Sequence, residues 1–516
     1  MKDEFVKPSK SELKVRLEAP ELCGAFPAGF YSLFTPAEAG ERELTVAQSV
    51  KDKLGTVDFG FNERPWLVAA GSCHFPIEVA QQIENRAAIL PEFLAITEEI
   101  LNDKFDGNPA ELLGLPSRDE QHGATIARFD DILMPDGKLL ATEIEGWSSG
   151  QGQIIATSQA YRLEVGKEGL SSPFSGIDLA AVASLGNSFG KEANVVILIP
   201  DIPDESGWKY TVKDFELFAT YCRVVGFNLT VERPAEIKVE GGKVKGKAGV
   251  YDVLYPFFPP SGYVDEKVTA GKGKQLLKVW ADGNVELFPE PSWLQSKLTA
   301  TAIFDPENKT AYLSKLSSCH PDWTLEDIEV RYREFKDDIF PWSWPLDPDK
   351  PPILDTGQQL DWEEFLAPEF LSLGWVFRPL LGTECAGLIF SGEMDPASMA
   401  DFAKKKLGQF IQGEPYPLKP GSGSRIDREG WTFENDYRSY FVQKQIPHQT
   451  FKARYLNPEG TGIRKREGFN ARICTTVFID GQGKAEIGDV DVTLRKDSRV
   501  HGAKNSIVTM ATFDNL

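Results

Sequence analysis

The segment over residues 127–146 constrains the fold of this chain most, because its pattern is that of a β-hairpin. Residues 128–133 and 138–145 have the composition of two strands, and Pro135-Asp136-Gly137 between them supplies turn residues. Pairing of the two strands would fix the few polar side chains of this segment relative to one another. The hairpin is therefore the first place to look for a site.

Four polar side chains of this hairpin suggest such a site. Glu143 and Glu145 are two residues apart, so on a strand they project from the same face. Two neighbouring carboxylates repel unless a cation lies between them. With Asp130 or Asp131 across from them and Arg128 nearby, they describe a site for magnesium and phosphate. The alternative is that these are solvated charges of an exposed hairpin.

Composition limits the partners of the chain. Its 516 residues predict about two to four domains with sizeable cores. A formal net charge of −21 argues against nucleic acid or an anionic membrane as the main partner, since both bind cationic surfaces. The six cysteines are scattered, and the charged N-terminus lacks an apolar signal segment. We therefore expect no disulfide framework and a reducing, cytoplasmic setting.

The first 120 residues contain two parts that differ in composition and in apolar periodicity. Residues 1–60 are rich in proline, glycine and charge, and we expect an irregular lead-in there. From residue 76 the apolar positions recur at helical spacing, which predicts two helices, or one kinked at Pro91, over residues 76–103.

The middle of the chain gives an α/β signal. A buried strand over residues 195–200, a helix over 213–225 and further strands over 228–232 and 250–258 predict a small open α/β domain. A strand and a helix are expected over residues 279–303. Residues 321–370 are acidic and proline-rich, which predicts a solvated helix, a stiff connector and a domain boundary near residue 350.

The last part of the chain predicts a separate lobe. Strands are expected over residues 374–379, 388–390 and 440–447, with a glycine-bearing turn over 380–387 and a helix over 396–410. This helix carries Lys404-Lys405-Lys406, interpreted as a solvated face. Residues 451–516 have more basic than acidic residues, which suits phosphate binding. The sequence has no phosphate-binding loop of the Walker type, so any binding of ATP must use a different phosphate-binding element.

Several segments follow one another in a recognisable order. Arg128-Phe129-Asp130 and Lys138-Leu139-Leu140-Ala141-Thr142-Glu143-Ile144-Glu145 come first, followed by the α/β segment, a helix bearing Lys297, Arg378-Pro379 with its glycine turn, and Gln443 to Pro447. Over roughly residues 120–516 this order resembles the circularly permuted branch of the ATP-grasp ligases, which includes glutathionylspermidine synthase. The resemblance implies an α/β (α+β) ATP-grasp fold with a pre-ATP-grasp domain. The expected units are residues 1–120, 121–190, 191–350 and 351–516, respectively an N-terminal region, the magnesium hairpin part, the pre-ATP-grasp domain and the ATP-binding lobe.

The resemblance also implies a reaction and a role for each residue. ATP-grasp ligases use ATP and Mg²⁺ to join a small-molecule carboxylate to an amine through an acyl phosphate. The metal ligands would be Asp130, Glu143 and Glu145, and Arg128 would stabilise charge on the transferred phosphoryl group. Nucleotide would be held by Arg378 and by Gln443 with the backbone of Lys444 and Gln445. Arg472 and Arg495, on the last predicted strands, are secondary candidates for phosphate contacts.

Two departures from the family pattern leave other functions open. Arg378 stands where a lysine usually grips phosphate, and Glu145 stands where the third metal ligand is usually asparagine. The alternatives to a ligase are a phosphotransferase on the same fold and a catalytically degenerate nucleotide-binding protein. For His448 and His501 the alternatives are a catalytic role and a solvated loop position, and we favour the solvated position.

Overall fold

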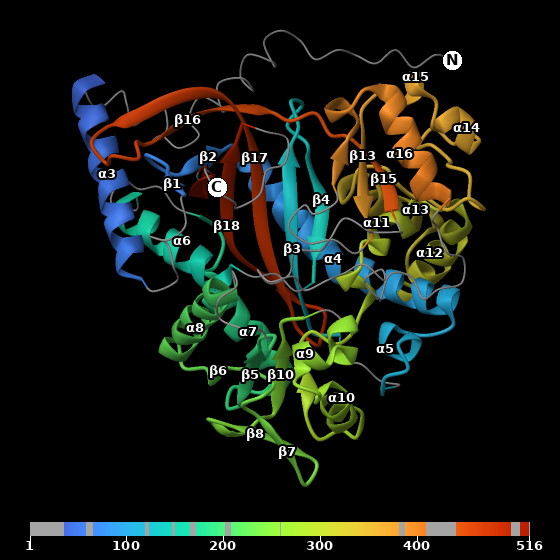
Figure 1. The fold of residues 1–516 in the computed structure, drawn as a ribbon, viewed down its shortest axis with the longest axis horizontal. Helices are drawn as coiled ribbons and strands as arrows, with labels where there is room; N and C mark the ends of the chain where they lie inside the picture. Colours follow the sequence, from blue (N-terminus) through green and yellow to red (C-terminus); the bar gives the residue numbers. More distant parts are fainter. Residues whose placement is uncertain are drawn as a thin grey trace.

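A computed structural model describes residues 36–57, 66–118, 123–146, 150–165, 172–201, 208–258, 260–380, 388–408, 440–496 and 506–514. Within these ranges the chain forms a mixed α/β structure with four sheets (Figure 1). The glycine turn predicted over 380–387 and the predicted solvated histidine His501 lie outside the described residues, apart from Leu380.

The main sheet has eight strands, drawn from both ends of the chain. Its order is β1-β19-β18-β17-β3-β4, with β16 paired to β17 and β2 paired to β19. The predicted hairpin is present as β3 and β4, and β17 lies antiparallel beside β3. The strands are β1 (Leu67–Val68), β2 (Cys73–Phe75), β3 (Thr125–Leu133), β4 (Leu139–Glu145), β16 (Thr450–Leu456), β17 (Ile463–Ile479), β18 (Ala485–Arg495) and β19 (Ile507–Phe513).

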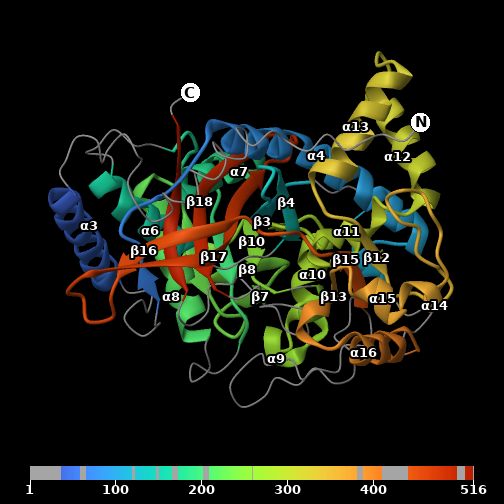
Figure 2. The same cartoon turned by 90° about the horizontal axis from the view of Figure 1, so that it is seen from above.

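Helix α4 (Ile77–Phe105) runs along one side of the main sheet (Figure 2). It is continuous through Pro91, so of the two predicted alternatives a single helix is present. Phe93 of this helix is fully buried in one core with Phe129 of β3. Packing against the sheet therefore supports the helix across a residue that removes one internal hydrogen bond. The short helix α5 (Pro109–Leu112) follows it.

The prediction of an irregular lead-in over residues 1–60 was wrong for residues 36–56, while residues 1–35 lie outside the described ranges. Residues Pro36–Thr56 form helix α3. Val46, Val50 and Leu54 recur every four residues and pack in one core with strands of the main sheet. The charged and glycine-containing surface of this helix hid that apolar stripe from the sequence analysis.

The predicted small α/β unit is confirmed as a second sheet below the first in Figure 1. Four parallel strands lie in the order β11-β10-β5-β6, flanked by helices, and a three-stranded antiparallel sheet adjoins them. The strands are β5 (Val195–Leu198), β6 (Leu229–Glu232), β7 (Lys238–Glu240), β8 (Lys243–Gly246), β9 (Gly249–Val250), β10 (Val253–Pro256) and β11 (Glu286–Leu287). Helices α8 (Trp208–Val224), α9 (Glu266–Thr269) and α10 (Gly273–Ala281), with the 3-10 turn η4 (Pro260–Val264), accompany these strands. Helix α6 (Gln151–Val165) packs against β18 and β19 of the main sheet, and helix α7 (Ile177–Phe189) packs against β17 and β18.

A third sheet forms the lobe at the right of Figure 1. Its order is β12-β15-β13-β14, all antiparallel, and it confirms the predicted strands near residues 375 and 440. Its strands are β12 (Ser343–Pro345), β13 (Trp375–Pro379), β14 (Ile389–Phe390) and β15 (Tyr440–Lys444). The surrounding helices are η5 (Trp293–Gln295), α11 (Leu298–Ala302), α12 (Pro306–Cys319), α13 (Leu325–Asp338), α14 (Trp362–Phe365), α15 (Pro368–Leu371), η6 (Ser391–Glu393) and α16 (Pro396–Gly408).

Two features of this lobe differ from what its composition suggested. The proline-rich segment contributes β12, and Trp342 and Trp344 are buried in the lobe's core rather than solvated. On α16, Lys406 is also buried, with its ammonium group over the rings of Phe402 and Tyr440. The aliphatic stem of a lysine can line a core in this way while its charge meets aromatic faces. The domain boundary near residue 350 stays a prediction.

Candidate functional site

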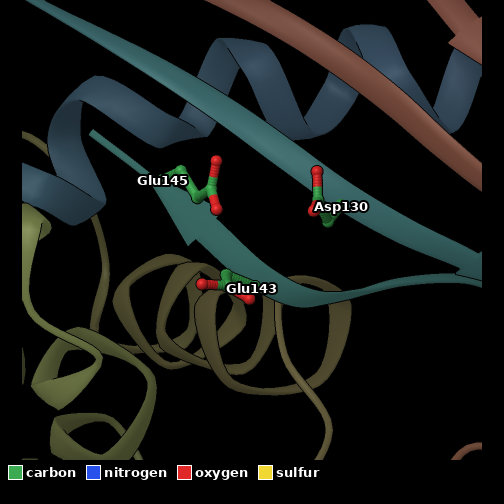
Figure 3. A group of neighbouring side chains, drawn as sticks. All are labelled: Asp130, Glu143 and Glu145. Atoms are coloured by element: carbon green, nitrogen blue, oxygen red, sulfur yellow. The ribbon is translucent and has the colours of Figure 1, made fainter. Parts of the chain in front are cut away.

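The hairpin brings the three predicted metal ligands together. Asp130 of β3 lies directly opposite Glu143 of β4, and Arg128 lies opposite Glu145. One carboxylate oxygen from each of Asp130, Glu143 and Glu145 lies within 4.8 Å of the other two (Figure 3). Three hard oxygen donors at this separation fit a magnesium ion, which takes carboxylates together with water and substrate phosphates.

Two arginines hold the Asp130 side of this cluster. Arg128 donates from Nε to Asp130 Oδ1 at 2.8 Å and pairs with Glu145 at 2.5 Å. Strand β17 supplies Arg472, whose Nη1 lies 3.1 Å from Asp130 Oδ2. The same strand places the Cys474 thiol 3.4 Å from Asp130 Oδ1. Every oxygen of Asp130 therefore accepts hydrogen bonds from the protein.

Glu143 is held by two further cations from distant parts of the chain. Its Oε1 pairs with Lys297, which precedes α11, and its Oε2 pairs with Arg378 of β13. Arg378 also donates to the backbone oxygen of Thr142 and to Oε1 of Gln443, the latter at 3.1 Å. We call the Lys297–Glu143–Arg378 arrangement the Glu143 bridge.

The pKa values of the three carboxyl groups differ because their charged partners differ. Burial acts to raise the pKa of Asp130, but Arg128 and Arg472 outweigh it and hold that pKa below its ordinary value. Glu143 likewise has a lowered pKa, because Lys297 and Arg378 outweigh its burial. For Glu145, burial prevails over the charge of Arg128 and raises the pKa to about 7. Two ionised carboxylates thus lie beside a third that titrates near neutrality.

A pocket connects the hairpin to the third sheet. The cavity has a volume of about 70 Å³ and opens to solvent. Its lining combines two carboxylates and two arginines with apolar side chains and the end of β15: Asp130, Ile132, Thr142, Glu143, Val376, Arg378, Leu388, Phe390, Gln443, Lys444, Gln445, Ile446, His448 and Arg472. A mixture of charged groups and apolar walls is a property of sites for polar small molecules.

The predicted nucleotide hinge lies at this pocket, but part of its backbone is already engaged. The N–H of Lys444 donates to the Trp342 oxygen at 2.9 Å, and the N–H of Gln445 donates to the Gly374 oxygen at 3.1 Å. The Gln443 side chain, which accepts from Arg378, donates to the Ser343 hydroxyl at 3.1 Å. These contacts fix the hinge to its sheet.

The remaining predicted residues divide between the pocket and its surroundings. Arg472 lines the pocket, whereas Arg495, opposite Asn470 at the end of β18, is not among the lining residues. His448, which was predicted to be a solvated loop residue, lies in a loop but is half-buried. It lines the pocket, its Nδ1 atom is buried without a hydrogen-bond partner, and burial lowers its pKa.

The sequence analysis assigned no site role to Lys297 or Cys474. Lys297 was visible as the lysine of a helix in the family-like order, but its pairing with Glu143 spans more than a hundred residues of sequence. Cys474 is identified only by the register of β17 against β3. Cys73 is disulfide-bonded. The sequence analysis expected no disulfide framework, because the cysteines are scattered along the chain. Disulfide bonds are typical of proteins in oxidising compartments.

Comparisons with known proteins describe the fold. No protein-family model matches the chain, and no curated protein sequence matches it. A glutathione synthetase-like effector from Globodera pallida, solved in its apo form, is similar over 93% of this chain and 98% of that one, with a TM-score of 0.53 and 13% identity. A putative gamma-glutamylcysteine synthetase from Methylobacillus flagellatus covers 80% of this chain and 84% of its own, with a TM-score of 0.38 and 8% identity.

The first of these likenesses establishes the class of fold. Over nearly its whole length the chain has a mixed α/β architecture like that of a glutathione synthetase-like protein. The permuted order and the closer likeness to glutathionylspermidine synthase stay predictions. Within the described ranges, no helix is both long enough and apolar enough to cross a membrane.

Proposed function

We propose that the chain is an ATP-dependent ligase that joins a carboxylate to an amine, with Mg²⁺, through an acyl phosphate, releasing ADP and phosphate. One observation carries this proposal. One pocket is lined by Asp130 and Glu143 of the three-carboxylate cluster, by two arginines suited to phosphate, and by the end of β15, which suits a base. The likeness of the fold to that of a glutathione synthetase-like protein supports the proposal.

The chemistry explains why these residue types are needed. A carboxylate is a poor acyl donor because its leaving group would be oxide, and phosphorylation converts it into a reactive acyl phosphate. Phosphoryl transfer depends mainly on cations placed around the phosphate oxygens and on alignment of donor and acceptor. Magnesium would be held by Asp130, Glu143 and Glu145, and it would supply positive charge to the phosphate oxygens.

The arginines and Lys297 supply the remaining charge. Arg378 is placed to hold phosphate oxygens with its planar fork, and Lys297 adds a point charge at the same end of the cluster. Arg128 lies between Asp130 and Glu145, where charge on the acyl phosphate would develop. The pocket wall formed by Gln443, Lys444 and Gln445 would hold the adenine.

A degenerate nucleotide-binding protein is the second candidate, and the Glu143 bridge favours it. Both oxygens of Glu143 are occupied by protein cations. If those pairs persist when nucleotide binds, the cluster lacks one of its metal ligands and turnover fails. In that case nucleotide would stabilise the protein without being consumed.

Measurement of ADP release separates these functions. The purified chain is incubated with ATP and Mg²⁺ and a panel of amino acids, small peptides and polyamines, and products are identified by mass spectrometry. The proposal expects ADP release that requires both a carboxylate and an amine, with an amide as product. A phosphorylated product alone indicates a phosphotransferase. Thermal stabilisation by nucleotide with no turnover on any pair indicates the degenerate alternative.

A further inference from the structure

The free protein already contains the cations that its carboxylate cluster needs. Lys297 and Arg378 take one oxygen each of Glu143. Arg128 and Arg472 take the oxygens of Asp130, and Arg128 also pairs with Glu145. Four cationic side chains therefore surround these three carboxylates and the buried Asp491, whose charge acts on Arg472 and Arg128, so the fully ionised cluster is already neutralised by the protein.

A free divalent cation would meet this cluster unfavourably. It would approach carboxylates that buried cations a few ångströms away already neutralise, at distances where charges interact strongly. It would also have to displace Lys297 and Arg378 from Glu143. Both side chains are largely buried, with exposed fractions of 14% and 9%, so each would lose its anionic partner at a place away from bulk water.

A polyphosphate removes both obstacles together. Its oxygens offer new anionic partners to Lys297 and Arg378, and its negative charge makes the cluster net negative. Glu143 is then free to bind a metal ion beside Asp130 and Glu145. The Glu143 bridge thus occupies, in the free protein, the positions that metal and phosphate would take.

We propose that the Glu143 bridge excludes free Mg²⁺, so that the metal enters this site only with, or after, a nucleotide polyphosphate. This inference rests on the proposed function, since it takes ATP as the ligand of the pocket. It adds an order of binding and names Lys297 and Arg378 as the residues that enforce it. The bridge also joins three elements, β4, β13 and the segment before α11. When phosphate replaces Glu143 as the partner of Lys297 and Arg378, the contacts of β4 with the other two elements would break while contacts with the ligand form.

Titration calorimetry of the full chain tests the inference with defined probes. MgCl₂ alone at millimolar concentration should show no saturable binding to wild-type protein. ATP in EDTA should bind, because Lys297 and Arg378 accept its phosphates without metal. Mg²⁺ with a non-hydrolysable ATP analogue should then bind more tightly than the analogue in EDTA.

Breaking the bridge should open the site to metal. In the variant Lys297→Met/Arg378→Met, both oxygens of Glu143 lose their partners, and affinity for Mg²⁺ alone should rise by about tenfold or more. Lys297→Met alone should give a smaller rise in the same direction. Lys315→Met is the matched control, because Lys315 pairs with Glu99 on the surface of α4 and should leave Mg²⁺ binding unchanged.

Two results would overturn the inference. One is saturable binding of Mg²⁺ alone to wild-type protein with the affinity seen beside nucleotide. The other is a folded Lys297→Met/Arg378→Met variant that gains no affinity for Mg²⁺. If that variant does not fold, the wild-type titrations still decide. Failure of ATP to bind in any condition would instead remove the proposed function itself, so the two failures are distinguishable.

Discussion

Asp130 and Asp131 are neighbours in sequence, are both buried, and both pair with arginine, yet they belong to different parts of the molecule. Asp130 projects to the pocket side of the sheet, toward Arg128 and Arg472. Asp131 projects to the opposite side, where Arg86 of α4 binds both of its oxygens at 2.7 and 2.6 Å. A register shift in the β3–β4 pairing separates the two residues.

The difference shows which features point to function. Arg86 and Asp131 form a closed pair, with exposed fractions of 3% and 0%, that joins a helix to a sheet. Asp130 shares its arginines with other carboxylates and borders a pocket. The pKa values differ accordingly: burial outweighs Arg86 and raises that of Asp131, whereas Arg128 and Arg472 outweigh burial and lower that of Asp130. Convergence of several charges on an open volume, rather than burial alone, marks the candidate site.

The largest effect is expected on the pocket side. Glu143→Gln keeps the shape of the side chain but removes a charge from the metal cluster. We expect ADP release to fall by about two or more orders of magnitude, because phosphoryl transfer depends on a positioned cation. The melting temperature of the variant serves as the control for folding. Wild-type turnover in both Glu143→Gln and Asp130→Asn would refute the assignment of the hairpin as the metal site.

The opposite side of the sheet should respond in stability. Arg86→Met leaves the Asp131 carboxyl group buried without its partner, which we expect to lower the free energy of unfolding by about 3–5 kcal/mol. Denaturant unfolding measures this directly. Asp130→Asn should cost less stability than Arg86→Met, since Asp130 borders the pocket. The reverse order would show that the two aspartates do not differ as described.

Nucleotide affinity should depend on Arg378. Arg378→Ala removes a phosphate partner, and we expect ATP to bind about tenfold or more weakly, since charge-assisted hydrogen bonds are among the stronger ones. Arg378→Lys keeps a cation and should retain most of the affinity. Calorimetry with ATP compares the two variants. Unchanged ATP affinity in Arg378→Ala would mean that β13 does not contact the nucleotide.

A smaller effect is expected from pH. The pKa of Glu145 is raised to about 7 in the folded protein from an ordinary 4.5, so the folded state keeps a proton that the unfolded chain has lost. Its contribution to stability is therefore present at low pH and is lost as pH rises through about 7. Binding of Mg²⁺ with nucleotide should strengthen over the same range and release a proton. Glu145→Asn should show a flatter pH profile; an identical profile would contradict this role.

The sequence predicted the local parts of this arrangement. The hairpin and the shared face of Glu143 and Glu145 follow from strand periodicity and turn residues, and the parallel strands near residues 195 and 254 follow from buried apolar runs. Long-range partners could not be predicted in this way. Neither the pairing of Asp130 with Arg472 nor that of Glu143 with Lys297 leaves a local pattern, because each depends on tertiary packing.

The most direct test of the account is the melting temperature of the full chain with ATP and Mg²⁺. A ligand that binds only the folded state raises that temperature, and the rise grows with the logarithm of its concentration relative to its dissociation constant. We predict an increase at millimolar nucleotide with Mg²⁺, a smaller increase with ATP in EDTA, and no increase with Mg²⁺ alone. Folded protein whose melting temperature does not change with millimolar ATP and Mg²⁺ would contradict the claim that this pocket binds nucleotide.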